Sequence, residues 1–367
     1  MDRLSATDLS SSFALRIDAA DRTVKLVLVT DAWPPQVNGV VRTLQETIRL
    51  LERSGHRVEV ISPDGFRCMP CPTYPEIPLA LFPGREVARR LSAAAADAVH
   101  IVTEGPLGSA ARRFCLREGI PFTSAYHTAF PEYIEERIHG TLGIGYAFLR
   151  KFHRPSSAVM VPTDTMIERL TKRRFEKLAY WSRGVDGELF RPRSKAFLGD
   201  KRPIYLYAGR VAPEKNIDAF LKLKLPGTKY VVGAGPSLKR LKAQYPDARY
   251  TGYVDDETLA SFYAAADVFV FPSTSETFGL VLLEALASGL PVAAYPVTGP
   301  LDVIGDSGAG ALKANLADAV EAAMSIDPGF CRAHALKFSW ADATAQFLDH
   351  VTRANTHIVA AEMELSR

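Results

Sequence analysis

The chain has 367 residues, of which 47% are hydrophobic and 23% are charged, and its formal net charge is +3. This length predicts more than one hydrophobic core, and the balanced composition excludes a fibrous or largely disordered chain. The net charge is too small for a general nucleic-acid binder, so no nucleic-acid partner is expected.

The amino terminus and the cysteines bear on location. Residues 1–22 lack the continuous apolar segment of a secretory signal, and we expect them to be poorly ordered. No apolar run reaches the roughly 18 residues that cross a membrane. Cys68 and Cys71 form a CxxC sequence without a second ligand pair. We interpret them as incidental thiols of a protein in a reducing cytoplasm.

The first half of the chain alternates short apolar runs with helical patterns. A β-branched run at 24–30 predicts a strand that is buried on both faces. After a Pro/Gly-rich turn, the spacing of apolar residues at 41–55 predicts a helix, and another is expected at 108–118. Strands alternating with helices indicate βαβ units. Further strands are expected at 56–62, 98–102, 121–125 and 157–163.

A polar, Gly/Pro-containing stretch at 182–203 is the best linker candidate, and the same alternation restarts after it. The chain therefore predicts two α/β lobes in tandem. In the second lobe we expect strands at 203–209, 228–235, 248–254, 266–273 and 291–297, and helices at 215–223, 259–266 and 278–289.

The turn at 209–215 (GRVAPEK) directly follows a predicted strand. Ligands of open parallel sheets bind at the carboxyl ends of the strands, so this turn faces a binding site. Gly209 allows a close approach of the backbone, Arg210 offers a forked guanidinium and Lys215 a point charge. This combination suits a diphosphate, with a solvated basic turn as the alternative.

Glu276 and Glu284 lie eight positions apart, close to two helical turns, which predicts that they share one face of a helix. Thr277, Phe278 and Gly279 would present backbone N–H groups at the start of that helix, where anions bind. Glu284 stands among apolar residues, where an unpaired carboxylate is costly, so we expect it to accept hydrogen bonds from hydroxyls. Alternatively, Glu276 only balances the helix dipole.

These segments resemble the second lobe of the family 4 retaining glycosyltransferases of GT-B architecture. The resemblance rests on YAGRVAPEKNIDAF, YVVGAGP, TGYV and ADVFVFPSTSETFGLVLLEALASGLPV, in this order, and extends over most of 24–351. It implies an α/β fold with two Rossmann-like lobes that face each other across a deep cleft. The implied domains are 1–182 for the acceptor, 183–340 for the nucleotide sugar, and 341–367 for a carboxy-terminal helix that crosses back to the first lobe.

The resemblance also implies roles for individual residues. Arg210 and Lys215 would hold the donor diphosphate, Glu284 the ribose hydroxyls and Glu276 the transferred sugar. The segment at Tyr253 would seat the base. The implied catalytic residues are His127, Arg210, Lys215 and Glu276. The implied donor-binding residues are Gly39, Gly209, Arg210, Lys215, Tyr253, Glu276, Thr277, Phe278, Gly279, Leu280 and Glu284.

In the first lobe, the loop that ends at Asn38 and Gly39 would approach the donor phosphate and the acceptor. Its lone glycine is far weaker than a GxGxxG sequence, so a nicotinamide site is not supported. Tyr126 and His127 follow a predicted strand, and a histidine there is otherwise a polar packing residue. The resemblance places His127 near the reacting carbon, and the acceptor-binding candidates are Asn38, Tyr126 and His127.

One segment departs from the family pattern, and one pair of aspartates is a possible metal site. The family often has Gly-Gly-x-x-Glu where this chain reads TGPLD at 298–302, so Asp302 is a shortened substitute whose role the sequence leaves open. Asp255 and Asp256 are better interpreted as a helix cap than as metal ligands. We therefore expect no essential metal and no cofactor beyond the nucleotide-sugar donor.

The implied reaction transfers a hexose with retention of configuration, while preorganised cations stabilise the departing diphosphate. The segments TDAWPPQVNGVVRTL, YHTAFPEY and FHRPSSAVMVPTDTM resemble members that glycosylate lipids. We therefore favour a UDP-sugar donor and a membrane lipid acceptor such as diacylglycerol. A GDP-mannose-dependent α-mannosyltransferase acting on a lipid or a soluble glycan is one alternative. A nucleotide-sugar epimerase of the same architecture and a non-catalytic binding protein are the others.

Basic residues are more frequent in the first half of the chain, which suits contact with an anionic membrane, although solvated helix faces are the alternative. We expect a cytoplasmic protein that is peripherally associated with the inner face of the membrane. A monomer and a weak dimer both stay open. The basic clusters are Arg85/Arg89/Arg90, Arg112/Arg113, Arg150/Lys151/Arg154 and Lys172/Arg173/Arg174/Lys177.

Overall fold

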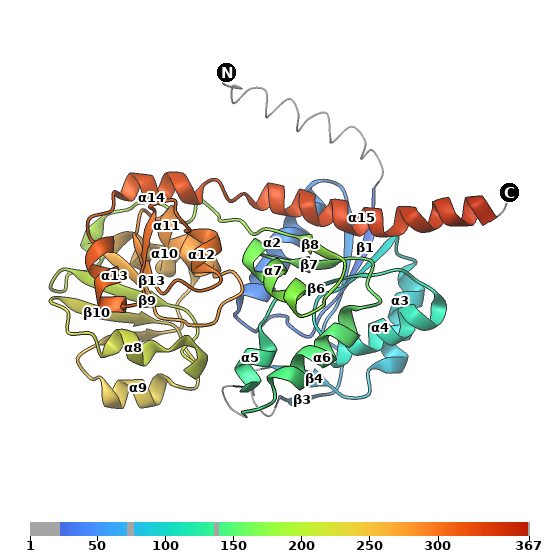
Figure 1. The fold of residues 1–367 in the computed structure, drawn as a ribbon, viewed down its shortest axis with the longest axis horizontal. Helices are drawn as coiled ribbons and strands as arrows, with labels where there is room; N and C mark the ends of the chain where they lie inside the picture. Colours follow the sequence, from blue (N-terminus) through green and yellow to red (C-terminus); the bar gives the residue numbers. More distant parts are fainter. Residues whose placement is uncertain (1–22, 72–76, 136–138, 366–367) are drawn as a thin grey trace, which may run out of the picture.

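The computed structural model describes residues 23–71, 77–135 and 139–365. The expectation of poor order at 1–22 lies outside the described residues. Two lobes stand side by side, each a parallel sheet covered by helices, and a long carboxy-terminal helix runs along the first lobe (Figure 1). No helix in the described ranges is both long and apolar enough to cross a membrane.

The first lobe is built on a six-stranded parallel sheet in the order β2-β1-β5-β6-β7-β8. A short antiparallel pair, β3 and β4, lies outside this sheet. The strands are β1 (Lys25–Val29), β2 (Arg57–Ile61), β3 (Cys68–Pro70), β4 (Pro78–Ala80), β5 (Ala98–Ile101), β6 (Thr123–Ala125), β7 (Val159–Val161) and β8 (Leu178–Tyr180). The helices are α2 (Gly39–Arg53), α3 (Gly84–Ala94), α4 (Pro106–Glu118), α5 (Phe130–Glu135), α6 (Leu142–His153) and α7 (Asp164–Lys172).

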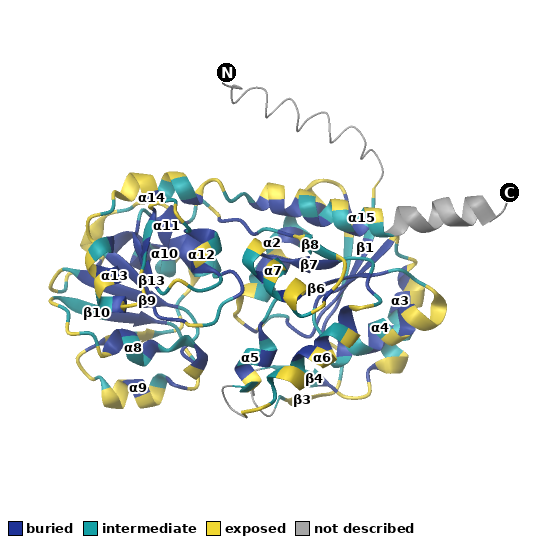
Figure 2. Cartoon of the chain, in the orientation of Figure 1, coloured by how far each residue is buried: buried dark blue, intermediate teal, exposed yellow. Residues whose placement is uncertain are grey.

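The central strand β1 shows why a continuous apolar run is needed. Side chains alternate across a sheet, and Val27 and Val29 pack on the core beneath α3 and α4. Leu26 and Leu28 pack on the opposite core with α2 and the carboxy-terminal helix. Because both faces are covered, both sets must be apolar. Figure 2 shows the same pattern, with buried strands and helices exposed on their outer sides.

The second lobe repeats this construction with the strand order β11-β10-β9-β12-β13-β14, also parallel. Its strands are β9 (Ile204–Ala208), β10 (Thr228–Val232), β11 (Arg249–Gly252), β12 (Val268–Phe271), β13 (Val292–Ala294) and β14 (Gly310–Leu312). Its helices are α8 (Ile217–Leu221), α9 (Leu238–Gln244), α10 (Asp256–Ala265), α11 (Leu280–Ala287), α12 (Pro300–Val303), α13 (Leu316–Ala323) and α14 (Pro328–Ala335), with short 3-10 turns η1 (Lys195–Phe197) and η2 (Pro213–Lys215).

The order of the strands in each sheet indicates where a ligand would bind. In the first sheet β1 has β2 on one side and β5 on the other, and in the second sheet β9 lies between β10 and β12. In such sheets ligands bind beyond the carboxyl ends of the strands where the order reverses. The loops at those points are 30–38 after β1, 209–216 after β9 and 272–279 after β12.

The carboxy-terminal helix α15 (Trp340–Leu365) returns to the first lobe, as the sequence predicts. The Trp181 indole N–H donates to the Ala343 carbonyl at 3.0 Å, and its ring lies 4.9 Å from that of Phe347. The chain crosses itself closely here. A Cβ on Gly184 would lie 2.1 Å from the Trp340 nitrogen, so only glycine fits this crossing.

Some expectations about local structure were wrong. Helix α11 begins at Leu280, so Glu276 lies in the preceding loop and does not share a helix face with Glu284. The hairpin of β3 and β4, which contains Cys68, was not expected from the sequence. The four cysteines all fall within the described residues and form no disulfide.

Candidate active site

The turn after β9 carries the cations predicted to meet a diphosphate. Gly209 has φ 141°, a conformation that favours glycine, and the following Arg210 carbonyl accepts a hydrogen bond from the Tyr207 hydroxyl at 2.7 Å. The Arg210 guanidinium lies 3.3 Å from the buried carboxylate of Glu214. This contact between i and i+4 lies within the turn, and Lys215 ends the 3-10 turn η2 that follows.

Lys215 and Glu276 form an ion pair of 2.7 Å between the turns after β9 and β12. Both side chains are largely buried, with 17% and 14% of their area exposed. Burial alone would lower the pKa of Lys215, but the Glu276 carboxylate together with Tyr133 and Tyr207 outweighs burial, so this pKa is raised and the ammonium stays charged. The two sequence-predicted residues for phosphate and sugar are therefore brought together.

The amino terminus of α11 offers backbone donors beside this pair. Gly279 is its N-cap with φ 86°, and no side chain caps the first turn. The first N–H groups of a helix lack intrahelical acceptors, so this end suits an anion. From the opposite lobe, a Cβ added to Gly39 would lie 3.7 Å from the Leu280 side chain, so the amino termini of α2 and α11 face each other.

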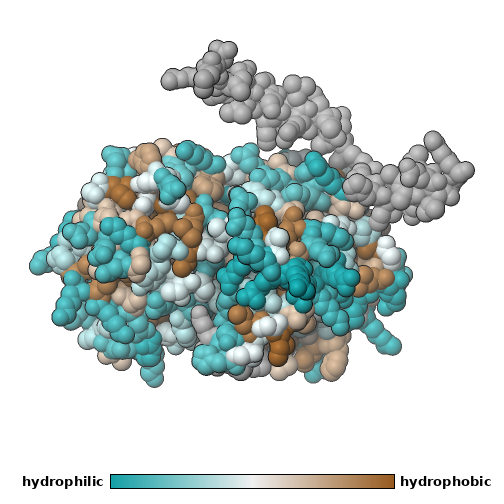
Figure 3. Space-filling model, viewed as in Figure 1, coloured by the Kyte–Doolittle hydropathy of each residue, from teal (hydrophilic) through white to brown (hydrophobic). Residues whose placement is uncertain are grey.

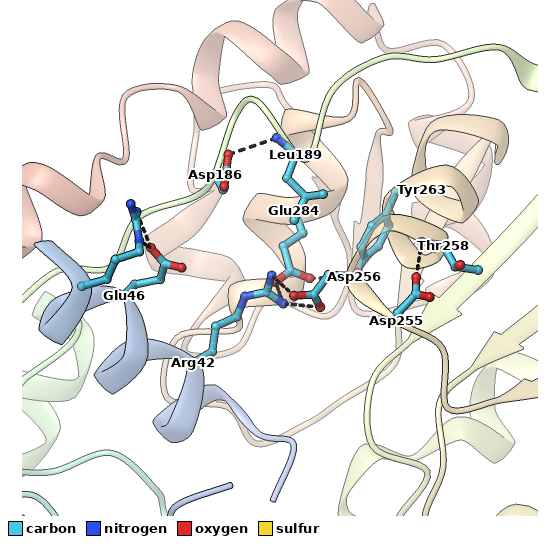
Figure 4. A network of polar contacts seen from close by, with 10 residues as sticks. Arg42, Glu46, Asp186, Leu189, Asp255, Asp256, Thr258, Tyr263 and Glu284 are labelled. Atoms are coloured by element: carbon cyan, nitrogen blue, oxygen red, sulfur yellow. Dashed lines mark hydrogen bonds and ion pairs between the residues drawn. The ribbon is translucent and has the colours of Figure 1, made fainter. Parts of the chain in front are cut away.

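Glu284 lies one turn into α11 and is only 5% exposed. The Tyr263 hydroxyl donates to its Oε2 at 3.1 Å, and Arg42 from the first lobe lies 3.2 Å from its Oε1. Arg42 also contacts Asp256 at the start of α10, so it joins two elements of the second lobe (Figure 4). Glu284, the carboxylate predicted to bind the ribose, therefore forms an ion pair with an arginine of the other lobe.

His127 follows β6 and is held by Arg183, whose guanidinium lies 3.3 Å from the His127 Nδ1. Arginine has no acceptor atom, so Nδ1 must accept and the ring proton of the neutral imidazole sits on Nε2. Burial and the Arg183 charge hold the pKa of His127 well below its usual value. The buried Nε2 has no hydrogen-bond partner among the described residues, so the neutral ring keeps one N–H donor that is unused in the structure.

The lobes contact each other through further hydrogen bonds. The Thr277 hydroxyl donates to the His127 carbonyl at 2.7 Å, and the Thr163 hydroxyl reaches the Thr277 carbonyl at 3.5 Å. The backbone N–H of Thr165 donates to Asp302 Oδ1 at 3.0 Å, and the Thr165 hydroxyl contacts Oδ2. Asp302, whose role the sequence left open, therefore joins α12 to α7.

Three other residues predicted from the sequence as ligand-binding candidates lie in different environments. Asn38 caps α2, because its side-chain oxygen accepts from the N–H groups of Val40 and Val41, both at 3.0 Å. Tyr126 is fully buried against Phe175, so its side chain packs in the core and does not face an acceptor. The Tyr253 side chain is 63% exposed beyond β11.

Two models of known families match the chain. Residues 191–327 match "Glycosyl transferases group 1" and residues 37–189 match "Glycosyltransferase Family 4". A GDP-mannose-dependent alpha-mannosyltransferase of Mycobacterium tuberculosis is 32% identical over 77% of this chain and 81% of its own. The chain is a glycosyltransferase of family 4. It is therefore a retaining hexosyltransferase with a nucleotide-sugar donor.

Other relatives of this glycosyltransferase agree with the assignment. The alpha-monoglucosyldiacylglycerol synthase of Streptococcus pneumoniae is 29% identical over 83% of this chain and 79% of its own. Among solved structures, Anabaena Alr3699/HepE in complex with UDP and glucose has a TM-score of 0.67 and 17% identity, covering 90% of this chain and 99% of its own. At that identity the likeness shows the fold, which is the expected GT-B arrangement.

Sequence reasoning missed one residue of this glycosyltransferase that the structure makes prominent. Arg42 lies in the first turn of α2, three residues after Gly39, and its sequence context is that of an ordinary amphipathic helix. Its position beside the glycine loop was the available signal. Only the packing of the lobes shows that it meets Glu284.

Proposed function

We propose that this family 4 enzyme transfers mannose from GDP-mannose to a membrane lipid and forms an α-linked glycolipid. The observation that carries the proposal is the Lys215–Glu276 pair beside the uncapped start of α11. This arrangement supplies a cation and backbone donors for a diphosphate and a carboxylate for sugar hydroxyls.

The choice of donor departs from the sequence-based preference for a UDP-sugar. The Mycobacterium tuberculosis relative is named for GDP-mannose, and this favours the mannosyltransferase alternative. The lipid acceptor is supported by the name of the Streptococcus pneumoniae relative, a diacylglycerol glycoside synthase. An epimerase is not favoured, because the relatives named here are transferases and synthases.

The chain's own residues account for the electrostatics of such a transfer. As the sugar–phosphate bond breaks, negative charge grows on the diphosphate, and in this proposal Lys215, Arg210 and the amino terminus of α11 stabilise it. Glu276 leaves Lys215 and accepts from hydroxyls of the bound sugar. His127 donates its Nε2–H to the sugar and does not act as an acid, since its pKa is held low. We propose that no metal is required.

The decisive experiment offers purified enzyme radiolabelled GDP-mannose, UDP-glucose and UDP-galactose with mixed lipid acceptors, in the presence and absence of EDTA. We expect a mannosylated lipid from GDP-mannose at a rate that EDTA leaves unchanged. Turnover only with UDP-sugars would overturn the donor, and a product only with soluble acceptors would overturn the lipid. Conversion of the free donor to an epimer would identify the epimerase alternative.

Calorimetry should distinguish the proposed roles of Glu276 and Glu284. Glu284→Ala should weaken binding of free GDP, because the ribose loses its acceptor. Glu276→Ala should weaken binding of GDP-mannose more than that of GDP, because its proposed partner is the sugar. Equal effects of both substitutions on free GDP would contradict the assignment of separate roles.

A lipid acceptor also requires the first lobe to reach a bilayer, and the structure narrows the basic surface that serves this purpose. Arg89 and Arg90 pair with Glu86, and the Arg150 guanidinium donates to the Arg173 carbonyl, so these cations are partly engaged. Exposed basic side chains without an ion pair in the described residues remain on and beside α6 and α7. We define the basic face by Lys151, Arg154, Lys172 and Arg174.

Figure 3 shows hydrophilic side chains over α7 and hydrophobic ones near α5 and α6. The exposed apolar residues of α6 include Ile144, 73% exposed, and Phe148, 55% exposed. Each cation near an anionic surface contributes about 1 kcal/mol, an attraction that salt screens over about 8–10 Å. The basic face and its apolar neighbours therefore support docking on an anionic bilayer.

The docking proposal is tested by co-sedimentation with vesicles of phosphatidylcholine, with and without phosphatidylglycerol. Binding should require the anionic lipid and be released by high salt. Changing the four residues of the basic face to Gln should reduce it strongly. The matched control changes four exposed lysines of the second lobe to Gln: Lys222, Lys224, Lys239 and Lys242. Equal losses in both variants, or binding insensitive to lipid charge, would contradict docking through this face.

A further inference from the structure

Glu284 needs a counter-charge to serve as a ribose acceptor. Its carboxylate is buried in a second-lobe core with Leu282, Leu283 and Ala285, and burial raises its pKa. A buried carboxyl group without a cation takes up a proton and then accepts hydrogen bonds poorly. The chain must therefore place a positive charge beside it.

That charge comes from the other lobe. The Arg42 guanidinium lies 3.2 Å from Glu284 Oε1, and it opposes the rise in the pKa of that carboxyl. Arg42 and Glu284 lie far apart in the sequence, one in each lobe. In the described part of the chain, Arg42 is the only cation that forms an ion pair with Glu284.

Arg42 is itself held in place by the second lobe and by the passage between the lobes. Its two terminal nitrogens lie 3.4 and 3.2 Å from the Asp256 carboxylate (Figure 4). Its guanidinium also lies 5.2 Å from the centre of the Phe190 ring. A planar guanidinium suits this combination of two carboxylates and an aromatic ring. These contacts fix its orientation toward Glu284.

The paired carboxylate keeps capacity for a ligand. A carboxylate offers about four lone-pair sites. Tyr263 uses one on Oε2 and Arg42 one on Oε1. One site on each oxygen stays available, which matches the two neighbouring hydroxyls of a ribose.

We propose that Arg42 is a positioning residue of the nucleotide site, which holds Glu284 ionised and oriented so that the ribose subsite is shared between the two lobes. This inference rests on the proposed function, since it takes Glu284 as the ribose acceptor. It assigns to the first lobe a part in nucleotide recognition beyond the loop at Gly39.

The pH dependence of nucleotide binding follows from the same contacts. The charged and titratable groups that act on Glu284 are Arg42 from α2 and both Tyr263 and Asp256 from α10. Glu46 lies near Arg42 on its own helix. Without Arg42, the burial of Glu284 is opposed only by the Tyr263 hydrogen bond, so protonation of Glu284 moves toward neutral pH. Nucleotide affinity should then fall as the pH is lowered.

The test is calorimetric titration of the full chain with GDP, and with UDP as a second probe, at pH 5.5, 6.5 and 7.5. For Arg42→Ala we expect Kd to rise about tenfold at pH 7.5, the effect of losing one charge-assisted contact. The loss should be larger at pH 5.5. Arg42→Lys should restore part of the affinity and flatten the pH dependence, because it keeps the charge but not the fork. Arg49→Ala on the same helix, whose side chain pairs with Glu46, is the control and should bind like the wild type.

A double-mutant cycle with Glu284→Gln completes the experiment. Once Glu284 is amidated, removal of Arg42 should have little further effect, and the pH dependence should disappear. If Glu284→Gln weakens GDP binding but Arg42→Ala does not, the inference fails while the donor site stands. Tighter binding by Arg42→Ala would show instead that Arg42 competes with the ribose. If Glu284→Gln itself binds GDP normally, the donor-site assignment fails and the inference with it.

Discussion

Lys215 and Glu276, the ion pair of the proposed donor site, stabilise each other in the structure. Each is largely buried, and each neutralises the other at 2.7 Å. Removing either partner leaves a buried charge without compensation. In the proposed function, a bound sugar diphosphate would replace both partners, with phosphate oxygens for the ammonium and hydroxyls for the carboxylate.

We predict that Lys215→Ala and Arg210→Ala each lower kcat by about 10² to 10³, because each removes a preorganised donor to the departing diphosphate. Initial rates with radiolabelled GDP-mannose measure the effect, and thermal unfolding checks that the fold is retained. Near wild-type rates in both variants would rule out the proposed diphosphate site.

His127 should stay neutral across the physiological range. The Arg183 guanidinium beside Nδ1 and the burial of the ring hold its pKa well below 6.5. We predict that ¹⁵N spectra of histidine-labelled protein show a neutral, Nε2-protonated ring from pH 8 to pH 5.5, with the signal assigned through His127→Asn. A ring that titrates near pH 6.5, or one protonated on Nδ1, would contradict this arrangement.

Helix α15 shows how one element joins the two halves of the chain. It begins at Trp340 beside the second lobe, and its buried Phe347 and Val351 pack into the first-lobe core with Trp181. The helices α7 and α12 meet through Thr165 and Asp302 at a second point. Contacts in at least two places therefore fix the relative position of the two lobes.

Phe347→Ala should destabilise the protein by about 3–5 kcal/mol, because it removes a fully buried ring and leaves a cavity between α15 and the first sheet. Urea unfolding followed by tryptophan fluorescence measures the loss. Asp349→Ala on the same helix removes an exposed side chain paired with Arg353 and should change the free energy of unfolding by less than about 0.5 kcal/mol. Equal effects would mean that α15 does not pack as described.

The stability of the whole molecule should depend on pH through its buried histidines. Burial lowers the pKa of His100 to about 3, whereas the ring titrates near 6.5 in the unfolded chain. Between these values the unfolded state binds the extra proton, so this contribution to stability is present above about pH 6.5 and is lost as the pH falls. Asp31 and Glu284 act in the opposite sense, because their raised pKa values let the folded state bind protons first.

We therefore predict that His100→Gln has a shallower loss of stability than the wild type between pH 7 and pH 4. The His100 Nδ1 lies 2.8 Å from the Thr123 hydroxyl, and the glutamine amide can replace that contact. Urea midpoints at pH 7, 6, 5 and 4 give the two slopes. Only the slopes are compared, because a constant difference between the two sets of midpoints would reflect the altered packing at position 100. Parallel slopes would show that His100 does not remain neutral in the folded state.

The sequence by itself determined the two α/β lobes, because apolar runs of strand length alternating with helical patterns can be buried only in covered parallel sheets. The turn at 209–215 and the two glutamates could be singled out as donor-site candidates, since they are local sequences at strand and helix ends, but the shared helix face predicted for Glu276 and Glu284 was wrong. Capping of α10 by Asp255 was likewise readable, and the structure shows its side chain accepting from Thr258 N–H at 2.7 Å.

The tertiary structure alone decided which distant groups meet. The Arg42–Glu284 and Thr165–Asp302 contacts each join residues of different lobes, and no local pattern encodes such a pairing. The burial of Tyr126, which removes it from the acceptor candidates, depends on how α6 and its neighbours cover β6. The same holds for charge. Whether an arginine is engaged by a neighbour or exposed to solvent is set by packing, because electrostatic energies depend on three-dimensional distance and burial rather than on order along the chain.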